Sequence, residues 1–425
     1  EFHYGPPIVG PVGGASPGHV ALCPSVPPEW RVEAFDPDGG DDTPGTPNPA
    51  ICSCAGCLGD MDVNGVLNAK DIQGFASALL MMSGNGCADI NQDAMVNTDD
   101  ILPFVDRILA APPCGLSRAF GTRIVTWNLL AYNGGAPSNR KTAYKRILNH
   151  LNADVIVAQE VEGLTGANDF LTTVLNATDG PGGYSLAEFT NGPDSDNALY
   201  YRADKIVYTN GNHITIATSP RITDRWLLDH VGSPMGGQFY VYSMHLKAGS
   251  SGEDPQNPVD RQTAAALVRA NANALPAGTQ IVYAGDLNLY TSAEGAWTEL
   301  TGSQADNDGR CFDPINAPGA WSASAGFSSI HTQSPHNDNA GAPPGGSSGG
   351  LDDRFDFMLI SDSLRDGVGL SYITSSYRAF GNDGNHFNAD INDPPTIPQG
   401  LFIADALHTA SDHLPVFMEL GLFMP

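Results

Sequence analysis

The segment TQIVYAGDLNLY (residues 279–290) joins a short apolar run to polar side chains that are costly to bury. Residues 281–284 read IVYA, which is typical of a buried β-strand. Asp286 and Asn288 follow at once. Because a buried carboxylate or amide needs a partner, the arrangement predicts that this strand ends at a site where these groups bind a metal ion, a phosphate or one another.

Polar residues also close, interrupt or open other apolar runs of the C-terminal part of the chain. They are Asn128, Glu160, His245, Asp356 and the pair Asp412 and His413. Taken singly, each is equally typical of a cap or a turn, and a single histidine is more often structural than catalytic. Their recurrence in six runs, counting the one that ends at Asp286, predicts that these side chains share one cleft.

Strand and helix patterns alternate from residue 118 to residue 425, which predicts an α/β domain. Strands are expected over 122–130, 154–161, 197–202, 238–246, 279–290, 354–361 and 415–420. Helices are expected over 139–151 and 260–275. The Gly-, Ser- and Pro-rich stretch from about 333 to 350 predicts a long surface loop.

Short motifs of these segments identify a family resemblance. They are TWN (126–128), QE (159–160), MHLK (244–247), GDLN (285–288), RFDFMLIS (354–361) and SDHLPV (411–416). In this order and rough spacing they resemble the endonuclease/exonuclease/phosphatase superfamily, over about residues 120–421. The resemblance implies the DNase I-like fold, a four-layered β-sandwich of two mixed sheets flanked by helices. It also implies cleavage of phosphoester bonds with Mg²⁺ or Mn²⁺.

The resemblance implies a metal site built from oxygen ligands. Glu160 matches the principal metal carboxylate of the family, assisted by Asn128 and Asp412. Hard carboxylate and amide oxygens suit Mg²⁺, which accounts for Glu, Asp and Asn in place of Cys. A cation on a non-bridging phosphate oxygen would offset the charge that develops in the transition state.

Catalytic roles follow from the same resemblance. Asp286 matches the residue that positions or deprotonates the attacking water, and Asn288 the residue that holds a phosphate oxygen. His413 matches the essential histidine, and Asp356 its carboxylate partner. His245 matches a second histidine that acts at the leaving group in nuclease-like members. The roles of acid and base between His245 and His413 stay open at this point.

Two basic residues near these motifs are candidates for contact with the substrate phosphate. They are Arg225 and Lys247, although each is also typical of an ordinary surface charge. Nuclease members usually pair the second histidine with an acidic residue, for which Asp194 and Asp196 are the candidates.

Residues 60–71 (DMDVNGVLNAKD) and 89–100 (DINQDAMVNTDD) form an internal repeat, and each precedes a helical pattern. Oxygen ligands at loop positions 1, 3, 5, 7, 9 and 12 predict one Ca²⁺ in each loop. In the first loop these are Asp60, Asp62, Asn64, the carbonyl of Val66, Asn68 and Asp71. In the second they are Asp89, Asn91, Asp93, Met95, Asn97 and Asp100.

This pair of loops resembles a dockerin module over residues 57–114, which would form a small all-α domain. The resemblance implies two bound Ca²⁺ and a cohesin-like partner. Loop positions 10 and 11 hold Ala69-Lys70 and Thr98-Asp99, which differ between the repeats. A calcium-stiffened spacer is therefore an equal alternative. The Pro- and Gly-rich residues 1–56 predict an arm or linker, and residues 1–114 could also serve self-association.

The cysteine content and the net charge limit the compartments and the binding partners that we expect. Six of the seven cysteines lie in the first 114 residues, which favours disulfides and an oxidising compartment, with zinc at Cys54 and Cys57 as the alternative. Cys311 is the candidate for a free thiol or one available to another chain. The net charge of −27 argues against a tight, non-catalytic nucleic-acid binder. The cysteine usage therefore favours an extracellular or cell-surface location, and a start without Met is expected of a mature or trimmed form. No stretch is long and apolar enough to predict a membrane span.

The leading hypothesis is a secreted, metal-dependent phosphodiesterase, with a nuclease acting on extracellular nucleic acid favoured. A phosphatase or a phospholipid diesterase of the same fold is the alternative within the family. A non-catalytic, calcium-dependent structural or assembly protein is the alternative of a different class. The corresponding domains are residues 1–56, 57–114 and 118–425.

Overall fold

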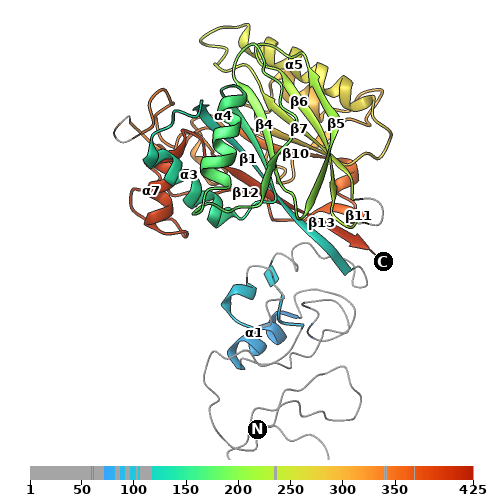
Figure 1. The fold of residues 1–425 in the computed structure, drawn as a ribbon, viewed down its shortest axis with the longest axis vertical. Coiled ribbons are helices and arrows are strands. Elements are labelled where there is room, and N and C mark those ends of the chain that lie inside the picture. Colours follow the sequence, from blue (N-terminus) through green and yellow to red (C-terminus); the bar gives the residue numbers. More distant parts are fainter. Residues whose placement is uncertain are drawn as a thin grey trace, which may run out of the picture. The chain divides into compact units, whose positions relative to one another are not determined.

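The computed structural model describes residues 59, 61, 71–81, 87–90, 96–101, 104–105, 117–233, 237–338, 340, 342–367 and 369–424. Contacts divide the chain into two compact units, Glu1–Ser117 and Arg118–Met424. Figure 1 shows the two β-sheets of the larger unit with helices on their outer faces.

The first sheet of the larger unit has the strand order β11–β13–β1–β2–β4–β3, with β12 paired to β13. Its strands are β1 (Ser117–Tyr132), β2 (Val155–Val161), β3 (Tyr184–Leu186), β4 (Asp196–Arg202), β11 (Gly369–Tyr372), β12 (Arg378–Ala379) and β13 (Val416–Met424). The second sheet has the order β5–β6–β7–β8–β10–β9. Its strands are β5 (Ile206–Ile216), β6 (Thr223–His230), β7 (Phe239–His245), β8 (Ile281–Asp286), β9 (Cys311–Phe312) and β10 (Asp356–Ser361).

Both sheets are mixed, and their register brings the polar strand ends together. Strands β1 and β2 run parallel, as do β7 and β8, whereas β10 is antiparallel to β8. In the second sheet His245 and Asp356 are the register partners of Asp286 on its two sides. The predicted α/β fold with two mixed sheets is therefore confirmed.

Alternation along the strands builds three layers of core. Val155 and Val157 of β2 pack in the core between the two sheets, whereas Ile156 faces the helices that cover the first sheet. Those helices are α3 (Ser138–Leu151) and α7 (Leu401–Ala410). A third core lies between the second sheet and α5 (Asn257–Asn273) and α6 (Gly295–Thr301). The smaller elements are α4 (Gly163–Asp169), η2 (Phe170–Leu175), η3 (Ala325–Ile330) and η4 (Asp362–Leu364).

Each predicted strand and both predicted helices are confirmed, with boundaries that differ by several residues. Strands β5 and β6 have no counterpart in the sequence prediction. A register shift between Tyr208 and His213 interrupts the alternation of β5, and β6 carries a buried charge at Asp224. Helix α7 was also missed, because its apolar residues lie between polar loop sequences.

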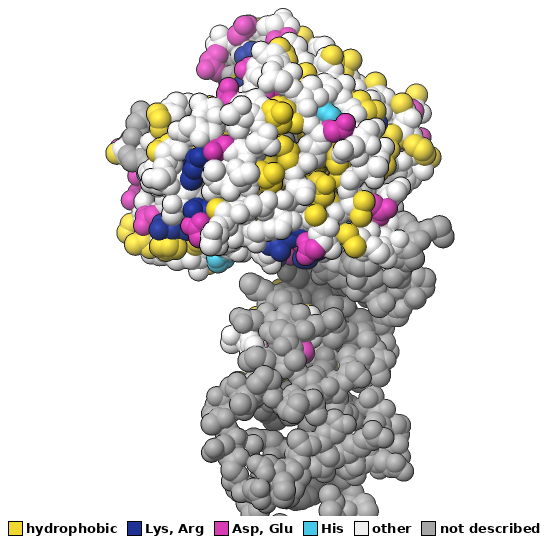
Figure 2. All heavy atoms as spheres, in the orientation of Figure 1, with side chains coloured by type: hydrophobic (Ala, Val, Ile, Leu, Met, Phe, Trp, Pro, Cys, Tyr) yellow, Lys and Arg dark blue, Asp and Glu magenta, His cyan; other side chains and the backbone are white. Residues whose placement is uncertain are grey.

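Several basic side chains of the larger unit form ion pairs with neighbouring carboxylates. Figure 2 shows that the basic side chains on this face lie in small groups beside acidic ones, among apolar and uncharged residues. Ion pairs of this kind include Lys141–Asp169 at 2.6 Å and Lys205–Asp154 at 2.8 Å. This face therefore presents no continuous basic surface.

The smaller unit contains α1 (Asp71–Met81) and η1 (Thr98–Asp100). Phe75 and Phe104 stack with ring centroids 3.7 Å apart, within a small apolar cluster. The two repeats make equivalent hydrogen bonds: Met61 N donates to Asp71 Oδ1 at 2.8 Å, and Ile90 N to Asp100 Oδ1 at 2.7 Å.

Only part of the predicted calcium ligands can be located in the structure. Asp71, Asp89, Asn97 and Asp100 are described. The ligands that lie outside the described residues are Asp60, Asp62, Asn64, Val66, Asn68, Asn91, Asp93 and Met95. Cys87 is disulfide-bonded, whereas Cys311 is a buried free thiol. None of the helices among the described residues has the length and apolar character needed to span a membrane.

Candidate active site

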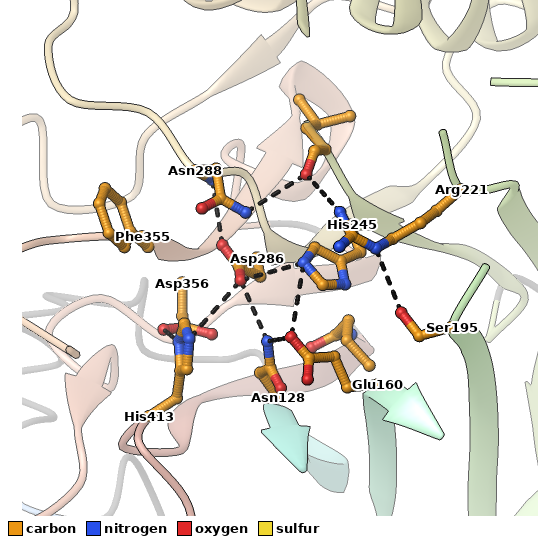
Figure 3. Close-up of polar contacts among 12 residues, drawn as sticks. Asn128, Glu160, Ser195, Arg221, His245, Asp286, Asn288, Phe355, Asp356 and His413 are labelled. Atoms are coloured by element: carbon orange, nitrogen blue, oxygen red, sulfur yellow. Dashed lines mark hydrogen bonds and ion pairs between the residues drawn. The ribbon is translucent and has the colours of Figure 1, made fainter. Parts of the chain in front are cut away.

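Asp286, at the end of β8, is the centre of a polar cluster (Figure 3). Three side chains converge on its Oδ2 atom. The amide of Asn128 donates to it at 3.1 Å, His245 Nε2 lies 3.4 Å away and His413 Nε2 lies 3.7 Å away. The cluster is assembled from the first sheet, the second sheet and the segment before β13, so it lies where the two sheets meet.

Asn128 connects the two carboxylates of the cluster. Its Nδ2 atom donates to Glu160 Oε1 at 3.0 Å as well as to Asp286. Its Oδ1 atom accepts a hydrogen bond from Leu130 N at 2.9 Å. Glu160 Oε2 accepts from Ala131 N at 3.0 Å. The β1–β2 pairing shifts register here, and Glu160 has a φ of 55°, so an irregular end of the strand pair aims both side chains at Asp286.

His413 is held by groups on both of its ring nitrogens and by its backbone. Its Nδ1 atom lies 2.7 Å from Asp356 Oδ2, and its carbonyl accepts from Trp127 Nε1 at 2.8 Å. Burial acts to lower the pKa of His413, but the carboxylates of Asp356, Asp286 and Asp412 outweigh it and raise the pKa well above its ordinary value. The predicted pairing of His413 with Asp356 is therefore present in the structure.

His245 has a different environment, although it touches the same carboxylate. Its Nε2 atom lies 3.9 Å from Glu160 Oε1, while its buried Nδ1 atom has no hydrogen-bond partner among the described residues. Burial lowers the pKa of His245 well below its ordinary value, and the charges of Arg221 and His413 lower it further. His245 is therefore built as a neutral imidazole.

The acidic partner predicted for His245 is not placed beside it. Asp194 lies 3.5 Å from the guanidinium of Arg221. Asp196 accepts hydrogen bonds from the backbone of Gly163 at 2.9 Å and of Gly192 at 2.6 Å. Each carboxylate is thus committed to a neighbouring loop or to an arginine.

Burial and neighbouring charge tune Asp286 itself. Burial raises the pKa of Asp286 to about 7; the charge on His413 opposes the rise, and the carboxylates of Asp356 and Glu160 add to it. A carboxylate with such a pKa exchanges its proton near neutral pH. This property suits a general base more than a structural group.

Asn288 and Arg221 line another side of the cluster. Asn288 N donates to Asp286 Oδ1 at 3.0 Å, and Asn288 Nδ2 donates to the carbonyl of Leu246 at 3.3 Å. Arg221 Nη1 donates to the same carbonyl at 3.2 Å, and its Nε donates to Ser195 Oγ at 3.2 Å. Sequence analysis missed Arg221, because the loop between β5 and β6 carries no motif or periodic pattern.

Asp412 and the segment that follows η3 close the opposite side. Asp412 Oδ2 accepts from Ser347 N at 2.7 Å and from Gln333 Nε2 at 3.4 Å. Its buried Oδ1 atom has no partner among the described residues. Gln333, also missed from sequence, places Nε2 2.7 Å from His413 Nε2.

The prediction of a surface loop over 333–350 is wrong for its first part. Ser334, Pro335 and His336 are buried. Several of their polar groups have partners inside the protein: Ser334 Oγ lies 2.9 Å from His336 Nδ1 and donates to the carbonyl of Ser347 at 2.9 Å. Because composition reports polarity and not partners, a folded loop of this kind looks like an exposed one in sequence.

The two predicted phosphate contacts do not join the cluster in the described structure. Arg225 Nη1 donates to Asn271 of α5 at 2.8 Å, and its guanidinium lies 4.8 Å from the ring centroid of Tyr240. It therefore faces the helix-covered side of the second sheet. Lys247 is partly exposed and donates to the carbonyl of Ala248 at 2.8 Å.

The chemistry of the donor set fits a hard divalent cation. The buried Asp286 and Asp412 and the half-buried Glu160 bring like charges into one region, and the orphaned Oδ1 of Asp412 is available as a ligand. No group of three or more His, Cys, Asp or Glu side chains in the described ranges is already drawn together as a metal cluster. One or two carboxylates with several waters are the usual protein contribution to Mg²⁺, so a closed cage is not required.

Comparison with solved structures gives several distant likenesses at the level of fold. The catalytic domain of human nocturnin with bound sulfate is 16% identical, with 73% of this chain and 97% of that chain covered and a TM-score of 0.45. TDP2 of D. rerio in complex with a single-strand DNA product is 13% identical, with coverages of 71% and 98% and a TM-score of 0.46. An endonuclease/exonuclease/phosphatase family protein of Bacteroides thetaiotaomicron is 14% identical, with coverages of 71% and 98% and a TM-score of 0.46.

Sequence comparison is decisive for the family. No curated protein matches the chain. The sequence model of the endonuclease/exonuclease/phosphatase family matches residues 125–413, a range that begins in β1 and ends at His413. The match therefore contains every residue of the polar cluster. Together with the two mixed sheets, it establishes that the chain belongs to the endonuclease/exonuclease/phosphatase family, whose members are phosphoester hydrolases.

Proposed function

We propose that this protein is a metal-dependent phosphodiesterase that hydrolyses nucleic acid, with Asp286 and His413 as its catalytic residues. The observation that carries the proposal is the convergence of Asn128, His245 and His413 on Asp286 Oδ2, with Asp356 behind His413 at 2.7 Å. A buried base that titrates near neutrality next to a charged imidazole suits attack of water on an anionic phosphodiester.

Each residue of the polar cluster has its own proposed role in catalysis. Asp286 accepts a proton from the attacking water as the new P–O bond forms and the bond to the leaving oxygen breaks. The His413 imidazolium, held by Asp356, offsets negative charge on a phosphate oxygen. Asn288 Nδ2 and the neutral His245 donate hydrogen bonds, which also stabilise negative charge on the phosphoryl group.

Glu160 and Asp412 are the proposed ligands of Mg²⁺ or Mn²⁺. Asn128 orients the Glu160 carboxylate through its amide, and Ser347 N holds Oδ2 of Asp412 so that Oδ1 stays available. When bound, the cation would supply charge neutralisation at a phosphate oxygen. It would also relieve the repulsion among the buried carboxylates.

Nucleic acid is the proposed substrate because the cluster offers neutral and cationic donors on two sides of Asp286, as a diester needs. The face drawn in Figure 2 has no continuous basic patch, which favours weak binding and release of a nucleic acid over tight binding. The test is nicking of supercoiled plasmid with Mg²⁺, Mn²⁺ or Ca²⁺. Parallel assays measure phosphate release from p-nitrophenyl phosphate and phosphocholine release from phosphatidylcholine vesicles.

We expect plasmid nicking by the unaltered protein and its loss in Asp286→Ala and His413→Ala. Faster release of phosphate or phosphocholine than plasmid nicking would replace the nuclease with a phosphatase or a phospholipid diesterase. Equal turnover by the unaltered protein and both variants on every substrate would instead support a non-catalytic structural or assembly protein.

We also propose that residues 57–114 bind two Ca²⁺ and act as a dockerin-like module in a secreted protein. The equivalent hydrogen bonds of Asp71 and Asp100, one in each repeat, support two loops of one design. The disulfide at Cys87 supports an oxidising, extracellular location.

Calcium binding is tested by equilibrium dialysis. We expect two Ca²⁺ per chain, and one in Asp71→Ala or in Asp100→Ala. Unchanged binding in both variants would refute the module. Sedimentation of the full chain with and without Ca²⁺ separates self-association from docking onto a cohesin-like partner.

A further inference from the structure

Gln333 connects two residues that the proposed mechanism uses. Its Nε2 atom lies 2.7 Å from His413 Nε2 and donates to Asp412 Oδ2 at 3.4 Å. The side chain is partly exposed, so it faces the site and is not packed into a core. No motif of the family resemblance includes this residue.

The backbone of Gln333 is fixed on both sides. Its N–H donates to the carbonyl of Asp353 at 3.1 Å, and its carbonyl accepts from the N–H groups of Asp352 and Asp353, each at 3.0 Å. It also pairs antiparallel with His413 in an isolated bridge. The amide is therefore presented to the imidazole from a constrained strand-like segment, in register with the residue it contacts.

Together, Asp356 and Gln333 hold both ring nitrogens of His413. Asp356 Oδ2 binds Nδ1 and Gln333 binds Nε2, which leaves the ring no freedom to rotate away from Asp286. A primary amide suits this place because it carries both a donor and an acceptor. Its nitrogen donates to a neutral imidazole and to Asp412, and a half-turn of the amide gives up the bond to Asp412 and presents the amide oxygen to an imidazolium.

We propose that Gln333 is a positioning residue of the site, which orients the imidazole of His413 toward Asp286 and links it to Asp412. The proposal rests on the proposed function, in which His413 holds the phosphate. The 331–336 segment is then part of the catalytic architecture. Bulk alone does not account for the contact, because the amide reaches two polar partners at once.

The kinetic test uses Gln333→Met, which keeps the length of the side chain and removes its hydrogen bonds. With bis(p-nitrophenyl) phosphate and Mg²⁺, we expect kcat to fall about 10- to 100-fold, as for other groups that orient an active side chain, while KM changes little. The matched control is Gln304→Met, an exposed residue whose amide donates to Glu299 at 2.7 Å. Its kcat should equal that of the unaltered protein.

A double variant separates positioning from general destabilisation. Because Gln333 and Asp356 act through the same imidazole, Gln333→Met should cost much less in an Asp356→Asn background than alone. Equal losses in both backgrounds would overturn the proposal. So would a Gln333→Met protein that keeps its kcat and gains a lower KM, because Gln333 would then merely obstruct the site.

An activity-independent readout distinguishes failure of this proposal from failure of the proposed function. In the full chain labelled with ¹⁵N-histidine, the ring signals of His413 are assigned by their absence in His413→Gln. We expect Gln333→Met to shift the Nε2 signal more than the Nδ1 signal, with retained circular dichroism. An unchanged Nε2 signal would refute the contact even if plasmid is cleaved, and a shifted one would support it even if no phosphoester is hydrolysed.

Discussion

The two histidines of the site lie within reach of the same oxygen of Asp286 and yet have opposite surroundings. His413 has Asp356 on Nδ1 at 2.7 Å and Gln333 on Nε2 at 2.7 Å. His245 has a buried Nδ1 with no hydrogen-bond partner in the described part of the chain. Carboxylates raise the pKa of the first against the effect of burial, whereas burial lowers the pKa of the second.

This difference bears on the roles of the two histidines, which the sequence left open. A histidine that stays charged can hold an anionic phosphate, and one that stays neutral can only donate or accept a hydrogen bond without gaining charge. The side of the cluster that contains His413 is therefore built for charge. The side that contains His245, Asn288 and the Leu246 carbonyl is built for neutral hydrogen bonding, with Arg221 at its rim.

The largest expected effect comes from exchanging the two histidines for glutamine. His413→Gln removes the charge and should lower kcat about 1,000-fold, within the range seen for loss of a charged catalytic donor. His245→Gln keeps a neutral donor in a different position and should lower kcat by about 10-fold at most, the value of one neutral hydrogen bond. The measurement is kcat on bis(p-nitrophenyl) phosphate with Mg²⁺. Equal losses would contradict the division between the two sides.

A smaller effect is expected from Asp356→Asn, which keeps the hydrogen bond to His413 but removes the charge. We expect kcat to fall about 100-fold. The carboxylate raises the pKa of His413, so the variant should have a lower one. If imidazolium is the active form, the alkaline decline in rate moves to lower pH. A pH–rate profile from pH 5 to 10 measures this, and an unmoved alkaline limb would show that His413 acts in its neutral form.

Arg221 and Arg225 extend the comparison of the two sides to the positive charges near the cluster. Arg221 donates to Leu246 and Ser195 beside Asn288, whereas Arg225 donates to Asn271 on α5. Arg221→Met should raise KM about 10-fold with little change in kcat, since one charged contact to substrate is worth about 1.5 kcal/mol. Arg225→Met should lower thermal stability and leave KM unchanged. A raised KM in Arg225→Met would restore the sequence prediction for that residue.

The contrast between these arginines shows which features of the site could be predicted from the sequence and which could not. Strand ends could be predicted from apolar runs, and Asp286, His413 and Asp356 meet as expected. The side of the sheet toward which a residue of β6 points could not be predicted. Strand β6 is buried on both sides, so buried and exposed residues do not alternate along it. Arg225 therefore faces a helix, opposite the neighbouring Asp224.

Two functional candidates were missed for another physical reason. These candidates are Gln333 and Arg221. Gln333 is 80 residues away from His413 in sequence, and their contact depends on a segment without periodicity. The loop that delivers Arg221 is similar in this respect. Polar side chains in such segments look like solvent-exposed ones until the tertiary fold supplies their partners.

The smallest expected effect concerns stability and tests the buried charge on which both histidines act. Burial raises the pKa of Asp286 to about 7, from about 3.9 in an unfolded chain. Between these values the folded state binds more protons than the unfolded state, so this group lowers stability as pH rises from about 4 to 7. Asp286→Asn removes the cost of ionisation.

In metal-free protein, Asp286→Asn should therefore have an unchanged melting temperature near pH 4 and one a few degrees higher above pH 7. The ion pair with His413 acts in the opposite sense, since it forms only once Asp286 is ionised and is lost as pH rises through the raised pKa of the histidine. Repeating the series in a His413→Gln background removes that contribution and should enlarge the gain. A gain that is the same at pH 4 and pH 8 would mean that Asp286 is not the strained charge at the centre of the cluster, and the contrast between the two histidines would then need another origin.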